Sequence, residues 1–439
     1  MTLRIHDISS AKRTILRRDS INYDEVPQSL LDQLTHIFGE AVTPAEAVRR
    51  ILADVRARGD ASLRDWTKRI DGLNLESLIT DSSSASVDES LILNLQFAAD
   101  RIRTFHEQQP ITSWRTPDGM LGQKISPIKR VGFYVPGGSA PLPSSLLMSV
   151  IPALVAGVKE IVVCTPPSQP NGDVPPVILA AAKICGVDRV YRIGGAQAIA
   201  AMAFGTESIP RVDKIVGAGN LFVTLAKQQV FGMVGIDGLA GPTETVVIAD
   251  DSANPKWVAA DLLAQAEHDP LATAILFTPS RKLAEAVQIE VGRQMEELSR
   301  AEIIAQSLDN RGGIVLTPDL ATAVELANDF APEHLCLATK NPNDWADKIT
   351  NAGGLFLGER SFEVLGDYVA GPSHVMPTSG TARFASPLNV LDFVHITSLI
   401  SLDAATAAQL SPIAASLARA ESLTAHESAA QMRSMNNEQ

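Results

Sequence analysis

Val131-Gly-Phe-Tyr-Val-Pro-Gly-Gly-Ser139 is a short β-rich run that passes into a glycine-rich loop, and it begins a regular alternation of such runs with helical segments. Strands are predicted at 131–135, 161–164, 189–193 and 214–216, and helices at 144–156, 176–184, 196–204 and 221–231. Alternation with short connections is typical of a parallel sheet covered by helices on both faces.

A second set of alternating segments follows the first. Its strands are predicted at 245–249, 274–277, 314–316 and 335–338, and its helices at 254–267, 280–300 and 319–329. Two successive α/β units of similar size indicate two sandwich domains with a cleft between them. Residues 28–110 are predicted to be helical, 1–25 to form a basic arm, and 402–420 to form an Ala-rich helix.

Composition restricts the class of protein. Of the 439 residues 45% are hydrophobic and 20% charged, which excludes disorder over most of the chain. The formal net charge of −13 argues against nucleic-acid binding, because phosphate contacts need clustered Lys and Arg. The most apolar stretch, 145–158, is too short to span a membrane.

The three cysteines, Cys164, Cys185 and Cys336, are far apart and form no CxxC motif. A disulfide framework and a thiolate zinc cluster are therefore not expected, and a reducing, cytoplasmic compartment is favoured. Any bound metal must then be held by His and by oxygen or amide ligands.

Four glycine-containing loops follow the predicted strands of the first unit, where ligands bind in open α/β sheets. They lie at 134–141, 194–197, 217–220 and 240–244. None is a dinucleotide fingerprint, because Gly217-x-Gly219 is followed by Phe222 where the third glycine belongs. Each loop alone is more often a tight turn, but four at the strand ends of one domain favour a ligand cleft.

Gln265 and His268 are three residues apart near the end of a predicted helix, so both lie on one face. A lone His at a helix C-terminus is usually a cap, whereas a His with a second polar ligand is a candidate metal pair. Asp367 and His426 extend this pair to two nitrogen and two oxygen donors, a set that zinc accepts without a thiolate. His426 must reach back within its own subunit or across to a partner.

Glu333 and His334 are adjacent and precede a predicted strand. A carboxylate can activate water and an imidazole titrates near neutrality, so the pair is a candidate for acid–base catalysis. On its own, such a pair is more often two polar residues in an exposed loop. His374 lies in a nearby glycine-rich loop that also holds Asp367.

Taken together, these segments resemble histidinol dehydrogenase, and the resemblance covers nearly the whole chain. The matching motifs are 131–139, 194–197, 236–244 continuing to 262–268, 331–335, 366–368, 371–374 and 423–426. One departure is visible: the family most often has Ser where this chain has Thr243, which keeps the hydroxyl and adds a methyl group.

The resemblance implies site residues by position. It implies one zinc per subunit held by Gln265, His268, Asp367 and His426, and catalysis by Glu333 and His334. It implies NAD contacts at Tyr134, Gln197 and Asn220. It implies substrate contacts at Thr243, His374 and Glu421, with Gln265, His268, His334, Asp367 and His426 close by.

The resemblance also implies two α/β/α sandwich domains with parallel-rich, incomplete Rossmann-like sheets, and a homodimer with small N- and C-terminal segments packed on the partner subunit. The expected divisions are an arm at 1–25, a zinc domain from 26–114 and 243–388, an NAD domain at 115–242 and a helical tail at 389–439.

The implied activity is the two-step, NAD-linked oxidation of L-histidinol through L-histidinal to L-histidine, the last step of histidine biosynthesis. The alternative is a paralogue that oxidises another small polar alcohol with the same scaffold. Glu333, His334, His374 and Glu421 all keep histidinol-type residues, which favours histidinol. A zinc hydrolase would not need the loops of Tyr134, Gln197 and Asn220.

Overall fold

A computed structural model describes residues 3–18, 26–137 and 141–434. By internal packing the chain divides into two units, the first formed by Met1–Gln109 with Ile128–Phe393 and the second by Pro110–Pro127 with Val394–Gln439. Gly138 and Ser139 of the first glycine-rich motif lie outside the described residues. No helix among the described residues is long and apolar enough to cross a membrane.

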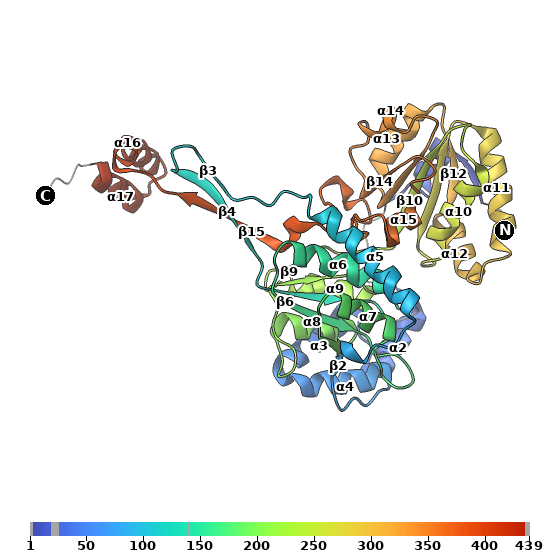
Figure 1. Cartoon of the computed structure of the whole chain (residues 1–439), viewed down its shortest axis with the longest axis horizontal. Helices are drawn as coiled ribbons and strands as arrows, with labels where there is room; N and C mark the ends of the chain where they lie inside the picture. Colours follow the sequence, from blue (N-terminus) through green and yellow to red (C-terminus); the bar gives the residue numbers. More distant parts are fainter. Residues whose placement is uncertain (1–2, 19–25, 138–140, 435–439) are drawn as a thin grey trace. The chain divides into compact units, whose positions relative to one another are not determined.

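The first sheet of the first unit has the strand order β2-β7-β6-β5-β8-β9 (Figure 1). Its parallel strands are β5 (Arg130–Tyr134), β6 (Glu160–Thr165), β7 (Arg189–Arg192), β8 (Lys214–Val216) and β9 (Gly235–Ile236). β2 (Ile79–Asp81) pairs antiparallel with β7. The helices that connect these strands are α6 (Pro143–Val155), α7 (Pro176–Ile184), α8 (Gly195–Phe204) and α9 (Leu221–Val230).

The second sheet repeats this topology, with the order β1-β12-β11-β10-β13-β14 and every pair parallel. Its strands are β1 (Ile5–Asp7), β10 (Glu244–Ala249), β11 (Thr273–Thr278), β12 (Gly313–Leu316), β13 (His334–Ala338) and β14 (Gly354–Leu357). Its helices are α10 (Pro255–Ala266), α11 (Arg281–Met295), α12 (Ala301–Arg311), α13 (Leu320–Phe330), α14 (Asn343–Ala346) and α15 (Glu363–Tyr368). Counted from β5 or from β10, each sheet has the doubly wound strand order 3-2-1-4-5. The predicted α/β class with two parallel-rich, Rossmann-like sheets is confirmed.

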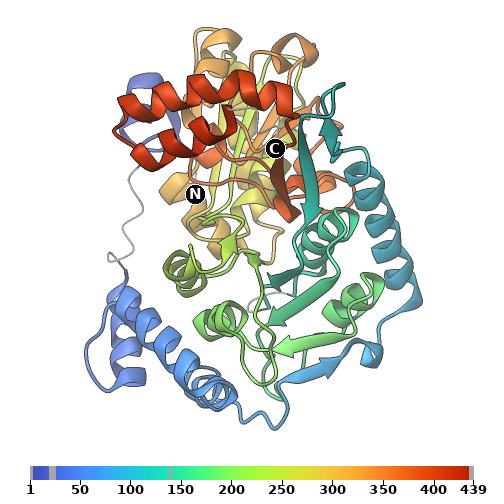
Figure 2. The same ribbon diagram turned by 90° about the vertical axis from the view of Figure 1, so that its left-hand side faces the viewer.

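The N-terminal helices pack on the helices that cover the first sheet (Figure 1 and Figure 2). They are α2 (Gln28–Phe38), α3 (Pro44–Arg58), α4 (Asp60–Asp71) and α5 (Glu89–His106). Val48 and Ile51 of α3 share a buried core with Ile199 and Met202 of α8, and α5 packs on α6 and α7. This packing differs from the expected grouping of 26–114 with 243–388. The apolar period of a helix shows that one face is buried, but it does not show which sheet covers that face.

The N-terminal segment also differs from its prediction. β1 pairs with β12, with Ile5 opposite Ile314, and α1 (Ile8–Arg13) follows it. Residues 3–18 therefore belong to the second sheet of their own chain, where the sequence predicted an arm that docks elsewhere. Edge pairing of a three-residue strand leaves almost no periodic signal in the sequence.

The second unit contains an antiparallel sheet of β15 (Val394–Ile400), β4 (Leu121–Pro127) and β3 (Trp114–Arg115), in that order. It also contains α16 (Ala404–Ala420) and α17 (Thr424–Ser434), which pack on each other. The tail expected to be helical from residue 389 thus begins with a 3-10 turn at Val390–Phe393 and a strand. This 3-10 turn is the last segment of the first unit, which also contains the 3-10 turns at Ser82–Ser84 and Thr381–Arg383.

Candidate active site

The residues expected to contact NAD lie at the carboxyl edge of the first sheet. Tyr134 is the last residue of β5, Gln197 lies in the first turn of α8 after β7, and Asn220 is the N-cap of α9 after β8. Because these strands are parallel, their carboxyl ends lie at one edge, which is where doubly wound sheets bind ligands.

Each of these three side chains has a defined environment. The hydroxyl of Tyr134 accepts a hydrogen bond from the Gly195 N–H at 3.1 Å, and burial raises its pKa to about 12, so it stays protonated. The Oδ1 of Asn220 accepts from the N–H groups of Phe222 and Val223, which is the capping role expected of an N-cap asparagine. Gln197 is 1% exposed, and its Oε1 has no hydrogen-bond partner among the described residues. An orphaned buried amide oxygen is consistent with a site that receives a polar ligand.

Glu333 and His334 lie at the amino edge of the second sheet, whereas the residues expected to contact NAD lie at the carboxyl edge of the first. His334 is the first residue of β13 and pairs in register with Thr245 of β10, so the pair lies at the amino edge of the second sheet. Thr243 and Glu244 lie at the same edge, where β10 begins. As the sequence predicted, the pair precedes a strand, so it lies at the edge opposite to the one where the loops of the first sheet were expected to bind ligands.

Glu333 is buried and held by two donors. Its Oε2 accepts from Thr243 Oγ1 at 2.5 Å and from the Glu244 N–H at 3.0 Å, while its carbonyl accepts from the Gly354 N–H of β14. Burial raises the pKa of Glu333 to about 7, and the hydrogen bonds act in the other direction. A carboxyl group that titrates near neutrality can act as a base at physiological pH.

The imidazole of His334 is buried between a carbonyl and a carboxylate. Its Nδ1 lies 3.0 Å from the carbonyl oxygen of Glu244, so Nδ1 carries the proton and donates it. Its Nε2 lies 3.7 Å from Asp367 Oδ1 and has no hydrogen-bond partner among the described residues. Burial lowers the pKa of His334, but the charges of Glu363, Glu333 and Asp367 together raise it above its ordinary value.

Asp367 and His374 are joined through the backbone. The Nδ1 of His374 donates to the carbonyl of Asp367 at 2.8 Å, and its Nε2 lies 3.3 Å from Ser145 Oγ. Burial lowers the pKa of His374, so it is neutral at pH 7. Burial raises the pKa of Asp367, but His334 and the other nearby histidines lower it below its ordinary value. Arg101 of α5 holds this loop by donating to the carbonyls of Val369 and Ala370.

The expected metal ligands are partly assembled in the first unit. Gln265 is 1% exposed, its amide contacts Thr243 Oγ1 at 2.6 Å, and the other end of the amide contacts Glu363 Oε1. His268 lies beyond the C-cap of α10, near enough for its charge to act on the pKa of Asp367. Within the described residues no three His, Cys, Asp or Glu side chains gather closely enough to hold a metal without other ligands.

Glu421 and His426 belong to the second unit, at the end of α16 and in α17. Both residues are exposed within it. The geometry of the first unit therefore describes the site without these two residues.

Two acidic residues at the site were given no role by the sequence analysis. Glu244 is 5% exposed, and its carboxylate forms a bidentate ion pair with Arg18 from the N-terminal segment. The backbone of Glu244 contacts both Glu333 and His334, so this ion pair anchors the peptide that holds these two side chains. Glu363 is 1% exposed, and burial raises its pKa to about 7. Burial of an ionisable group marks a candidate functional residue, and for both acidic residues the structure was needed to show that burial.

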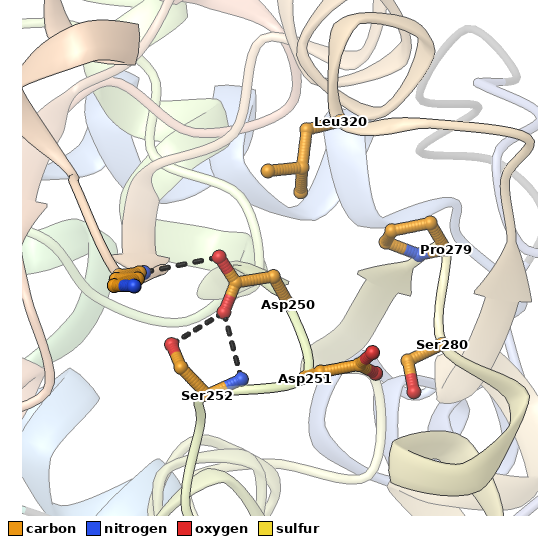
Figure 3. A pocket seen from close by; sticks show the side chains of 7 residues that line it. Asp250, Asp251, Ser252, Pro279, Ser280 and Leu320 are labelled. Carbon is orange, nitrogen blue, oxygen red and sulfur yellow. Dashed lines mark hydrogen bonds between the residues drawn. The ribbon is translucent and has the colours of Figure 1, made fainter.

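A cavity of about 350 Å³ lies at the carboxyl edge of the second sheet, away from this cluster (Figure 3). The carboxylate of Asp250 there accepts from the N–H and hydroxyl of Ser252 and from the Lys340 N–H. These bonds satisfy the carboxylate locally. None of the expected site residues lines this cavity.

Comparison with known proteins was made on the sequence and on the fold. The family model described as histidinol dehydrogenase matches residues 39–434. The histidinol dehydrogenase of Deinococcus radiodurans is 52% identical over 415 residues, covering 93% of this chain and 95% of that protein. That of Thermus thermophilus is 51% identical over 389 residues, covering 88% and 93%. The crystal structure of histidinol dehydrogenase from Elizabethkingia anophelis superposes with a TM-score of 0.88 at 36% identity, covering 99% of this chain and 98% of that chain.

Proposed function

The chain belongs to the histidinol dehydrogenase family, and on that premise we propose that it oxidises L-histidinol through L-histidinal to L-histidine, with NAD and a zinc site. The observation that carries the proposal is the arrangement of Glu333 and His334. One is a buried carboxylate that titrates near neutrality, and the other is an imidazole whose Nδ1 is committed to a backbone carbonyl.

His334 is the base for the hydroxyl group of the substrate. The nearby carboxylates raise the pKa of His334, so the ring must first lose its Nε2 proton to act as a base. Because Nδ1 donates to the Glu244 carbonyl, the neutral ring then has its lone pair on Nε2, the nitrogen that faces Asp367. Nε2 accepts the hydroxyl proton while the carbon loses hydride to NAD, and the product of this step is the aldehyde. The tautomer of His334 is thus fixed by the backbone carbonyl of Glu244, which is part of β10.

Glu333 is the base for the second oxidation. As a carboxylate it takes a proton from water, and the hydroxide that remains adds to the aldehyde carbon and gives the hydrated aldehyde as its single anion. This hydrate then loses a second proton to a base and a second hydride to NAD, which leaves the carboxylate product. Thr243 holds Glu333 through a hydrogen bond of 2.5 Å, so its hydroxyl has a positioning role that the added methyl group does not remove.

The donor set fits zinc in its chemistry. Gln265, His268, Asp367 and His426 would hold it with nitrogen and oxygen atoms, and when bound it would anchor the imidazole and amine of histidinol. His334 Nε2 and Glu363 Oε2 are among the buried polar atoms that have no hydrogen-bond partner within the described residues, so both are available to a ligand at this site.

The remaining assignments follow from the family. We assign NAD contacts to Tyr134, Gln197 and Asn220, and substrate contacts to Thr243, His374 and Glu421. Because Glu421 and His426 belong to the C-terminal unit, we propose a homodimer in which this unit completes a site.

The test is histidinol-dependent reduction of NAD by the purified protein, before and after removal of metal with a chelator. We expect activity with L-histidinol, its loss on chelation and its return with zinc. A second small amino alcohol without an imidazole should give less than a hundredth of the rate. Equal rates with both alcohols, or full activity in the metal-free protein, would contradict the proposal.

A further inference from the structure

We propose that the buried ion pair of Lys227 and Asp237 is a positioning device for the loop Gly217–Asn220, and so sets the affinity for NAD. This inference rests on the proposed function, because it takes NAD as the ligand of that loop. Neither residue is among those that we assign to contact NAD, substrate or metal.

The two charges hold both polar backbone groups of one residue. Lys227 of α9 is 2% exposed, and Asp237, which follows β9, has a side chain that is 9% exposed. The Oδ2 of Asp237 accepts from the Gly217 N–H at 2.8 Å, and the Nζ of Lys227 donates to the Gly217 carbonyl at 2.8 Å. The ammonium group and Asp237 Oδ1 also contact each other directly. Gly217 is therefore fixed from both sides by one charge pair.

Gly217, which the ion pair holds in place, also contacts the end of β5, where the following loop begins. Its φ of +121° lies where residues with a side chain are rarely found, and a Cβ there would collide with the backbone carbonyl of Tyr134. Gly217 thus lies directly against the backbone of Tyr134, whose hydroxyl accepts from the Gly195 N–H. The loops that follow β5, β7 and β8 are linked in this way, and they carry Tyr134, Gln197 and Asn220.

Stability alone gives no reason for this pair. Moving two charges into a protein interior costs as much free energy as their attraction returns, or more, and well-packed apolar residues are often as stable. What apolar residues cannot provide is one acceptor and one donor aimed at the same peptide residue. We infer that the pair fixes the backbone direction of the loop that starts at Gly217.

The test is the double variant Lys227→Met/Asp237→Asn, which removes both charges and leaves an acceptor for the Gly217 N–H. The chain offers a matched control in Lys214 and Asp392. Lys214 begins β8, whose other end leads into the loop, and its ammonium binds the carboxylate and carbonyl of Asp392. The control is therefore Lys214→Met/Asp392→Asn. It removes an ion pair at the opposite end of β8 from the loop, and this pair does not touch Gly217.

The readouts are the dissociation constant for NAD by calorimetry and the KM values for NAD and for histidinol. We expect the Lys227/Asp237 variant to bind NAD about tenfold more weakly, with KM for histidinol within twofold of the wild type. The control should change neither value by more than twofold. A dissociation constant for NAD within twofold of the wild type in the Lys227/Asp237 variant, or an equal loss in the control, would overturn the inference.

Failure of the proposed function is distinguishable from failure of the inference. If the wild type itself does not bind NAD, the proposed function falls and the inference falls with it, whereas unchanged binding in the variant removes the inference alone. If the double variant does not fold, Asp237→Asn alone decides. It should weaken NAD binding at least threefold, and unchanged binding would count against the pair.

Discussion

The Nδ1 of His334 and the backbone carbonyl of Glu244 lie 3.0 Å apart, and this contact joins the first residue of β13 to the first residue of β10. It fixes the orientation of the imidazole through the sheet itself. It also directs Nε2 toward Asp367 and the polar cluster around it.

His334→Asn should abolish most activity without loss of metal, because asparagine can still donate to the Glu244 carbonyl but supplies no base. We expect kcat to fall by about 10²–10⁴-fold, the usual contribution of general acid–base catalysis. Steady-state rates together with zinc content by atomic absorption check this prediction. The control is His36→Asn on the exposed face of α2, which should keep full activity. A residual kcat above a tenth of the wild type would exclude His334 as the base.

Glu333→Gln should damage the aldehyde step most, because the amide cannot take a proton from water. With L-histidinal as substrate, NADH formation should fall by about 10²-fold or more. The reverse of the first step, histidinal reduction with NADH, should fall less than tenfold. In the wild type the aldehyde step should accelerate as the pH rises through about 7, the raised pKa of Glu333. Equal, slight effects on both steps would remove the water-activating role.

Arg18→Met should destabilise the protein, because it leaves the carboxylate of Glu244 buried without its partner. Breaking one side of a buried pair costs about 3–5 kcal/mol. The double variant Arg18→Met/Glu244→Gln should recover most of this loss in urea unfolding. The exposed pair of Arg4 and Asp309 in the same segment is the control, and Arg4→Met should cost less than about 1 kcal/mol. A loss no larger for Arg18→Met than for Arg4→Met would contradict the account.

Asp261→Asn should change how stability depends on pH. Burial, with help from the charge of Glu359, raises the pKa of Asp261 to about 7 from its ordinary value of 3.8. The folded state therefore binds a proton that the unfolded state releases between pH 4 and 7, and stability falls as the pH rises through this window. At pH 8 the variant should be more stable by roughly 1–4 kcal/mol. Near pH 4 the difference should vanish in thermal unfolding. A constant difference at both pH values would refute the assignment.

The strands and helices of the two α/β units were predicted well from the sequence, because buried parallel strands and their covering helices leave strong periodic signals. The parts that it missed depend on contacts between distant segments. The edge strand β1 pairs with β12 about 300 residues away, and β15 pairs with β4. The predicted helix at 280–300 ends at Met295, and α12 begins at Ala301. Nothing in the local pattern of these segments identifies their partners.

The candidate site shows the same division. The motifs identified Glu333, His334 and Asp367, and the fold of the first unit brings the three together. Arg18 and Glu363 were missed because their roles depend on contacts with residues far away in the sequence and on burial, which the neighbouring residues in the sequence do not show. The rule that ligands bind at carboxyl edges selected the Tyr134 and Asn220 loops as candidates, whereas Glu333 and His334 were selected as an acid–base pair that precedes a strand.

We propose that one site carries out two successive oxidations, with His334 and Glu333 as separate bases. The most direct measurement is the number of NADH molecules formed for each L-histidinol consumed, with excess NAD, in zinc-loaded protein. We expect two NADH and one L-histidine for each L-histidinol, with no free aldehyde. A ratio of one, with L-histidinal released into solution, would contradict it.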